Sequence, residues 1–197
     1  KLIREGISTT YRKKMQEALE SIEMLKGSLQ KKDMYAHPAY VAPLVEYITD
    51  DFRKSRIAIN DDTIGGMIVC DSSDQAKVVF EKMQDTGFSS ALILHDVDDK
   101  ETRQGYVTAF KKGTIDFLIV YNMLLTGFDA PRLKKLYLGR VIKDHNLLQA
   151  LTRVNRPYKG YRYGYVVDFA DIRAEFDKTN KAYFDEEYLY EIGWLQD

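Results

Sequence analysis

From about residue 62 onwards, short apolar segments alternate with segments of helical pattern. The run from Ile64 to Cys70 is typical of a buried strand, whereas Asp74 to Asp85 places apolar side chains at i, i+3, i+4 and i+7, as an amphipathic helix does. The same alternation predicts strands at Ala91–His95, Asp116–Tyr121, Lys135–Leu138 and Tyr163–Asp168, and helices at Glu101–Lys112 and Asn146–Val154. Almost wholly apolar strands joined by helices indicate parallel βαβ units. We therefore expect an α/β fold whose parallel sheet has helices on both faces and ligand sites at the carboxyl ends of its strands.

The first sixty residues follow another pattern. Apolar residues at helical spacing predict helices at Tyr11–Lys26 and Tyr40–Arg53. We interpret residues 1–60 as a helical lead-in or part of a neighbouring domain, and residues 61–175 as the α/β domain. Residues 176–197 are expected to form an acidic tail or the start of a further helical region.

Composition excludes several classes of protein. The chain has 197 residues, of which 45% are hydrophobic and 30% charged, an ordinary mix for a soluble globular protein. There is neither an apolar run of membrane-spanning length nor a secretory signal. The single cysteine, Cys70, excludes an internal disulfide framework and a thiolate metal cluster, so a cytoplasmic setting fits. Because the chain does not begin with Met, we expect a fragment of a longer protein.

Charge is unevenly distributed along the chain, although the net charge is only −1. Nine Lys or Arg residues and one acidic residue lie between Arg132 and Arg162, and nine acidic residues and three basic ones lie between Asp168 and Asp197. Such asymmetry can mark a face that meets phosphates. It is equally compatible with a solvated basic surface beside an acidic tail.

A first candidate site follows the strand that ends near Tyr121, where residues 126–131 read Thr-Gly-Phe-Asp-Ala-Pro. Gly127 allows close approach of the backbone to a ligand. Asp129 supplies a carboxylate, expected at the carboxyl edge of the sheet, that can accept a hydrogen bond from a ribose hydroxyl or hold an arginine. The alternative is an ordinary turn from strand to loop.

A second candidate site is the predicted helix around Gln149 and Arg153, which are spaced i, i+4 and share a face. Arg156 continues that face, and Pro157 ends the helix. Arginine carries a permanent charge and a fixed fork of donors, which suits binding to a phosphate during phosphoryl transfer. The alternative is a solvated basic helix face.

A third candidate site lies where the strand ending at Cys70 meets the following helix. Ser72 or Ser73 is expected to cap this helix. Exposed amides and hydroxyls there can also hold a backbone phosphate of a nucleic acid. Capping alone remains the simpler interpretation.

The three sites in this order resemble motifs IV, V and VI of the second RecA-like domain of superfamily 2 helicases and translocases. The residues between and after the last two sites narrow the resemblance. Leu-Tyr-Leu at 136–138, Lys-Asp-His-Asn-Leu-Leu-Gln at 143–149, Ala-Leu-Thr-Arg-Val-Asn-Arg at 150–156 and Tyr-Gly-Tyr-Val-Val-Asp-Phe at 163–169 are similar to the motor (R) subunit of type I restriction enzymes. The resemblance is strong over residues 64–172 and weak outside them. Thr152 and Asn155 stand where many helicases have glycine.

The resemblance implies roles for these residues. Arg153 and Arg156 would reach across an interdomain cleft to the γ-phosphate of ATP, with help from Gln149. Gly127 and Asp129 would line the same cleft. Ser72, Ser73 and Thr126 would contact the backbone of double-stranded DNA, along which ATP hydrolysis drives translocation.

The sequence has no Gly-Lys pair, so it lacks a phosphate-binding Gly-x-x-x-x-Gly-Lys-Ser/Thr loop, and it has no Glu-x-Lys nuclease motif. The resemblance therefore implies that ATP and Mg²⁺ are bound mainly by a first RecA-like domain, and that this domain and a nuclease domain belong to the same longer polypeptide. Modification and specificity subunits are the further partners that it implies. We expect no metal site, and no ATPase activity from this chain alone.

Two alternative functions remain open. The chain could be the second lobe of another superfamily 2 motor, acting on DNA or RNA. It could also be a catalytically inactive RecA-like module that binds DNA or docks a partner, although retention of Arg153 and Arg156 disfavours this.

Overall fold

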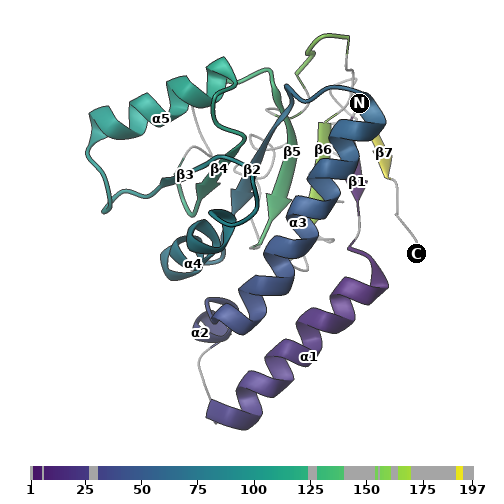
Figure 1. The fold of residues 1–197 in the computed structure, drawn as a ribbon, viewed down its shortest axis with the longest axis vertical. Coiled ribbons are helices and arrows are strands. Elements are labelled where there is room, and N and C mark those ends of the chain that lie inside the picture. Colours follow the sequence, from purple (N-terminus) through teal and green to yellow (C-terminus); the bar gives the residue numbers. More distant parts are fainter. Residues whose placement is uncertain are drawn as a thin grey trace.

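The computed structural model describes residues 2–5, 7–26, 31–123, 128–139, 154, 156–160, 164–169 and 190–192. They form one seven-stranded sheet with helices packed against it (Figure 1). The strands are β1 (Leu2–Glu5), β2 (Gly65–Val69), β3 (Ser90–Ile93), β4 (Phe117–Val120), β5 (Leu133–Leu138), β6 (Gly164–Asp168) and β7 (Tyr190–Ile192). Their order is β3-β4-β2-β5-β6-β1-β7, and every neighbouring pair is parallel. The five predicted strands and their parallel pairing are thus confirmed.

In the described part of the chain, five helices connect or precede these strands, namely α1 (Thr9–Lys26), α2 (Lys31–Tyr35), α3 (Pro38–Ile59), α4 (Ser73–Met83) and α5 (Lys100–Lys112). Their ends follow local sequence signals. Asp99 caps the start of α5 by accepting a hydrogen bond from the amide of Thr102, and Gly113 ends that helix in the left-handed region at φ 89°. Among the described residues, no helix is both long enough and apolar enough to cross a membrane.

Alternate residues of the strands fill two cores, one on each face of the sheet. Met67 and Val69 of β2 belong to the core beneath α5, which contributes the buried ring of Phe110. Ile68 of β2 points to the other face, where the core includes residues of α1, α3 and α4, with Phe52 of α3 fully buried. The expected sheet with helices on both faces is therefore confirmed, and its central strands are buried on both sides, which explains their continuous apolar runs.

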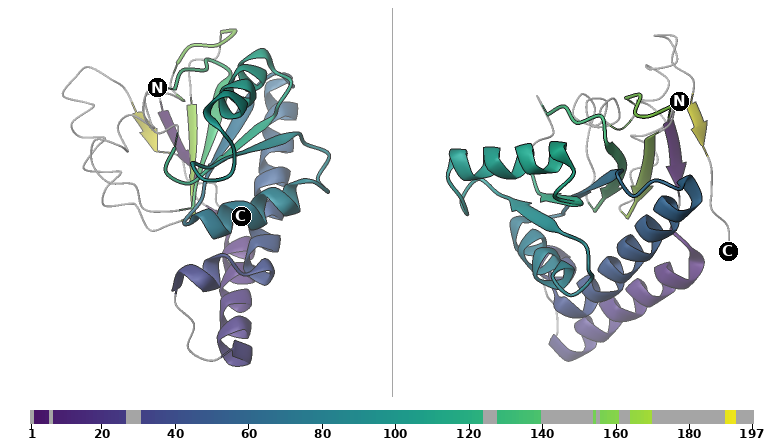
Figure 2. Two further views of the ribbon diagram at one scale, coloured as in Figure 1. Left: turned by 90° about the vertical axis from the view of Figure 1, so that its left-hand side faces the viewer. Right: turned by 45° about the horizontal axis from the view of Figure 1, so that its top comes forward.

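The first sixty residues contain the two long helices that their pattern predicts, together with a strand that was not predicted. Beyond a helical lead-in, Leu2–Glu5 forms β1, which pairs with β6 and extends the sheet. The helix α3 shares the core of the sheet through residues such as Ile48 and Phe52. Figure 2 shows α1 lying alongside α3 on the side away from the sheet. The described part of residues 1–60 thus packs as one body with the α/β domain.

Three residues counted in the basic stretch of the sequence are buried in the structure. Arg132, Lys134 and Lys135 are exposed by only 4%, 1% and 0%, so they add nothing to a basic surface. Lys135 pairs with Asp51 of α3 at 2.9 Å, and Tyr137 donates a hydrogen bond to the same carboxylate at 2.7 Å. The charge count therefore overstated the basic face, because β5 is a central strand and its lysines point into the two covered faces.

Candidate nucleotide and nucleic-acid site

Four of the eight predicted site residues lie within the described part of the chain, and they are Ser72, Ser73, Asp129 and Arg156. The other four, Thr126, Gly127, Gln149 and Arg153, lie outside the described residues, so their expected roles stay predictions. The acidic segment 176–197 also lies outside them, apart from β7.

Asp129 and Arg156 are brought together by the fold although 27 positions separate them. Nη1 of Arg156 lies 3.1 Å from Oδ2 of Asp129. The side chains are 56% and 52% exposed, so both charged groups remain open to a ligand that approaches from outside. This pair joins the second and first candidate sites of the sequence into one place.

The pair lies by the amino ends of β5 and β6, and the expected position of Asp129 at the carboxyl edge of the sheet was wrong. Asp129 directly precedes β5, which begins at Leu133, and Arg156 precedes β6. The reason is the parallel topology. Parallel strands start at the same edge, so the chain that leaves the carboxyl end of β4 at Val120 must travel back to the amino edge before β5 can begin. Asp129 lies four residues before β5, close to that amino edge.

The segment that carries Arg156 is held against the sheet through hydrogen bonds to its main-chain carbonyl groups. The buried ammonium of Lys134 donates hydrogen bonds to the carbonyl oxygens of Val154, at 3.2 Å, and of Arg156. A Cβ atom on Gly164, the first residue of β6, would lie 2.2 Å from the carbonyl oxygen of Val154, so only glycine permits this approach. Burial away from water lowers the pKa of Lys134 to about 8.

Sequence reasoning missed Lys134. The predicted strand began at Lys135, whereas β5 begins at Leu133, contains both lysines and is buried throughout. A lysine in such a strand needs polar partners, because an unpaired buried ammonium is costly.

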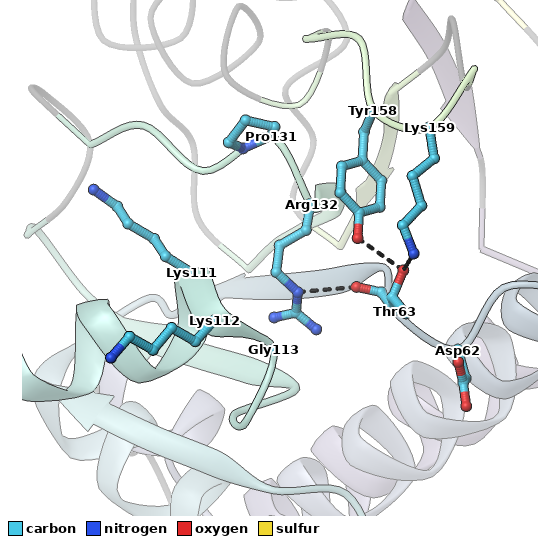
Figure 3. Close-up of a pocket in the computed structure, with 9 residues that line it drawn as sticks. All are labelled: Asp62, Thr63, Lys111, Lys112, Gly113, Pro131, Arg132, Tyr158 and Lys159. Atoms are coloured by element: carbon cyan, nitrogen blue, oxygen red, sulfur yellow. Dashed lines mark hydrogen bonds between the residues drawn. The ribbon is translucent and has the colours of Figure 1, made fainter.

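An open pocket of about 610 Å³ lies beside the amino ends of β2 and β5, and its lining includes Pro131 and Tyr158 (Figure 3). Arg132 lies inside it, but its guanidinium already donates to the carbonyls of Thr63, at 2.9 Å, and of Phe110, at 2.8 Å. Tyr158 shares a hydrogen bond of 2.8 Å with the hydroxyl of Thr63, and Lys159 donates to that hydroxyl at 2.9 Å. These contacts join the segment after Arg156 to the residues just before β2. The polar side chains of Arg132, Tyr158 and Lys159 in the pocket wall therefore already bond other parts of the protein.

The third candidate site has the capping geometry that its sequence predicts. Ser72 lies between β2 and α4, and its hydroxyl accepts a hydrogen bond of 3.0 Å from the amide of Gln75. Ser73 is the first residue of α4, and both serines are partly exposed. Because β2 ends at Val69, this site lies at the carboxyl end of the sheet, opposite the edge that carries Asp129 and Arg156.

The described residues contain no group of three or more His, Cys, Asp or Glu side chains that could hold a metal ion. The described candidates supply the guanidinium of Arg156, the carboxylate of Asp129 and, at the opposite edge, the two serine hydroxyls.

The family of type I restriction enzyme subunit R domain 3 matches residues 71–171, more than half of the chain. The chain belongs to this family. The matched residues include Ser72, Ser73, Asp129 and Arg156, together with the four candidates outside the described residues. The resemblance stated from the sequence is therefore confirmed.

Curated relatives of this R-subunit domain are restriction enzyme subunits. The MjaVIIP endonuclease subunit of Methanocaldococcus jannaschii is 28% identical over 91% of the chain, which covers 18% of that protein. The SauCOLORF180P endonuclease subunit of Staphylococcus aureus is 30% identical over 63% of the chain, which covers 14% of that protein. The chain thus spans less than a fifth of either relative's length.

Solved structures share the fold of this R-subunit domain. A fragment of an HsdR subunit of a type I restriction enzyme from Vibrio vulnificus YJ016 matches 99% of the chain with a TM-score of 0.63 and 14% identity, over 36% of that fragment. The C-terminal domain of the DEAD-box protein Dbp5 matches 100% of the chain with a TM-score of 0.55 and 13% identity, over 89% of that domain. The RecA-like fold of the helicase C-terminal type is therefore confirmed.

Proposed function

We propose that this domain is the second RecA-like lobe of an ATP-dependent DNA translocase in the R subunit of a type I restriction enzyme, and that Arg156 supplies a guanidinium to the transferred phosphate. The observation that carries the proposal is the exposed Asp129–Arg156 pair, 3.1 Å apart, formed by the two sequence motifs that the superfamily uses at the nucleotide. Membership of the R-subunit family supplies the restriction context.

The pair has the properties that such a role needs. Arginine has a planar fork of hydrogen-bond donors that matches a phosphate, so Arg156 can bind one through two nitrogens at once. At 56% exposure the guanidinium can exchange the carboxylate of Asp129 for a phosphate presented by another lobe. An exposed ion pair contributes at most about 1 kcal/mol, so little free energy opposes this exchange.

The chemistry proposed for Arg156 is electrostatic. When the lobes close on ATP and Mg²⁺, held mainly by the first RecA-like domain, the guanidinium stabilises negative charge that develops on the γ-phosphate in the transition state. Gln149 and Arg153 act beside it, and Gly127 lines the cleft. Asp129 is then released and can accept a hydrogen bond from the ribose.

The opposite edge of the sheet is proposed to contact DNA. Ser72 and Ser73 lie at the start of α4, where amides and hydroxyls favour a backbone phosphate, and Thr126 acts with them. Closure of the lobes at one edge thereby moves a DNA contact at the other. The first RecA-like domain and a nuclease domain of the same polypeptide, and the modification and specificity subunits, complete the proposed assembly.

The test is the rate of ATP hydrolysis by the complete subunit in the presence of duplex DNA. Arg156→Ala is expected to lower kcat by about a thousandfold, the size of effect that removal of an arginine finger has in other phosphoryl-transfer enzymes. Arg53→Ala is the matched control, because Arg53 is an exposed arginine on α3, on the other side of the sheet. The isolated domain is expected to have no ATPase activity.

An unchanged ATPase rate in Arg156→Ala would favour the inactive docking module instead. Stimulation of the wild-type subunit by RNA or by single strands, in preference to duplex DNA, would favour another superfamily 2 motor.

A further inference from the structure

The neighbourhood of Lys134 combines two features. Its ammonium is buried and bonds the backbone carbonyls of Val154 and Arg156. The pairing of β5 with β2 shifts at this point, since Gly65 pairs with Leu133 and the next residue, Gly66, pairs with Lys135. Lys134 therefore lies at an irregularity in the pairing of β5 with β2, between the partners of Gly65 and Gly66.

We propose that Lys134 is a positioning residue for Arg156, which holds the backbone of the arginine-bearing segment at the amino ends of β5 and β6. This inference rests on the proposed function, because it gives Lys134 a role through the guanidinium of Arg156.

The contacts of Lys134 are specific to this segment. The buried ammonium bonds main-chain oxygens that lie two residues apart and include the carbonyl of Arg156 itself. The neighbouring Lys135 differs, because it pairs with the carboxylate of Asp51 on α3, at 2.9 Å. No carboxylate of a described residue forms an ion pair with Lys134.

The backbone at this point is fixed from a second direction. The carbonyl of Val154 lies so close to Gly164 that a Cβ atom there would be 2.2 Å away, and the side chain of Val154 is fully buried. The packing of Val154 therefore holds the segment against the sheet, and Lys134 bonds the carbonyl oxygens of both Val154 and Arg156. An error of about 1 Å in the placement of a catalytic group can cost a hundredfold in rate, so such a clamp has a functional consequence.

The test compares ATP hydrolysis by the complete subunit in the variants K134M, R156A and the double variant. Methionine keeps the length and apolar stem of lysine but removes its donors. K134M is expected to lower kcat by at least tenfold with little change in the KM for ATP. If Lys134 acts through Arg156, the double variant has the kcat of R156A alone, because the clamp has nothing left to position.

Lys135→Met is the matched control, because it removes a buried lysine of the same strand whose partner, Asp51, lies on α3. It is expected to lower the melting temperature while the folded protein keeps its kcat. A second readout is amide hydrogen exchange of the peptide that contains residues 154–160. Exchange is expected to be faster in K134M and unchanged in Lys135→Met.

The outcomes separate the two proposals. Normal activity in R156A overturns the proposed function and, with it, the positioning role of Lys134. Loss of activity in R156A, with normal kcat in K134M or with additive losses in the double variant, overturns the role of Lys134 alone. If K134M does not fold, Lys134→Gln, which keeps amide donors on a shorter side chain, is expected to show the same non-additivity, and additive losses there likewise overturn the inference.

Discussion

Nη1 of Arg156 lies 3.1 Å from Oδ2 of Asp129, and both side chains are more than half exposed. The pair connects the segment before β6 to the segment before β5, at one edge of the parallel sheet. An arginine in this position is accessible to a ligand, and a phosphate can replace the carboxylate of Asp129 as its partner.

The exposed pair is expected to matter little for stability. Asp129→Asn should lower the free energy of unfolding by less than about 1 kcal/mol, because solvent screens both charges. Asp51→Ala is the contrasting variant, since Lys135 then loses its buried carboxylate, at a cost of about 3 to 5 kcal/mol. Urea unfolding of the domain measures both. A loss above about 2 kcal/mol in Asp129→Asn would assign the pair a structural role.

Lys134 makes the stability of the domain depend on pH. Its pKa is lowered to about 8 by burial, whereas a lysine in an unfolded chain has a pKa of about 10.4. Between these values the unfolded chain binds more protons, so the contribution of Lys134 to the free energy of unfolding rises with pH, by about 3 kcal/mol over the whole window. Below pH 8 both states are protonated and this contribution no longer changes.

The measurement is the difference in free energy of unfolding between wild type and K134M from pH 7 to 10. Subtraction of the variant removes the contributions of other titrating groups. The difference is expected to rise in favour of the wild type above pH 8, and a flat or falling difference would show that Lys134 titrates normally in the folded domain.

Gly164 is expected to be essential for seating the arginine-bearing segment. Gly164→Ala places a Cβ atom 2.2 Å from the carbonyl oxygen of Val154, a backbone atom that cannot rotate away. A cost of about 2 to 3 kcal/mol follows from such overpacking. Gly105→Ala is the control, because Gly105 lies within α5 with no atom near its added Cβ, and alanine there should stabilise the helix by up to about 1 kcal/mol. Equal melting temperatures for the two variants would contradict the close approach.

Ser72 allows capping and DNA contact to be separated. Ser72→Asn and Ser72→Asp both keep a side-chain acceptor for the amide of Gln75, so both should preserve α4. Only aspartate adds negative charge, which would repel a backbone phosphate. Binding of the complete subunit to duplex DNA at fixed salt should therefore be about tenfold weaker for Ser72→Asp than for Ser72→Asn, a difference of about 1.4 kcal/mol. Equal affinities of the two variants for duplex DNA would mean that Ser72 caps α4 and does not contact the DNA backbone.

Much of the fold could be predicted from the sequence, because the central strands are buried on both faces and form continuous apolar runs. The run Phe-Leu-Ile-Val of β4 and the helical spacing of α4 are examples. The strand β1 could not be predicted in this way. Its four residues, Leu-Ile-Arg-Glu, include two charged side chains, and its position depends on pairing with β6, more than 150 residues later in the chain.

The sequence identified two residues of the candidate site correctly but did not predict where in the fold they lie. Asp129 and Arg156 were identified by their motifs, and the structure joins them. The edge of the sheet predicted for Asp129 was wrong, because a residue that follows one strand in the sequence can lie next to the amino end of the following parallel strand. The lysines of β5 were counted as surface charge, since sequence alone does not reveal that Asp51 or the carbonyl of Arg156 lies within reach.

The central claim is that Arg156 stabilises the transition state of phosphoryl transfer, and binding of a transition-state analogue tests it most directly. The measurement is the affinity of the complete wild-type and Arg156→Ala subunits for ADP with aluminium fluoride, and for ADP alone. We predict that Arg156→Ala loses at least a hundredfold in affinity for the analogue and keeps its affinity for ADP, because the guanidinium acts only where charge develops. Equal loss for both ligands, or no loss for either, would contradict the account.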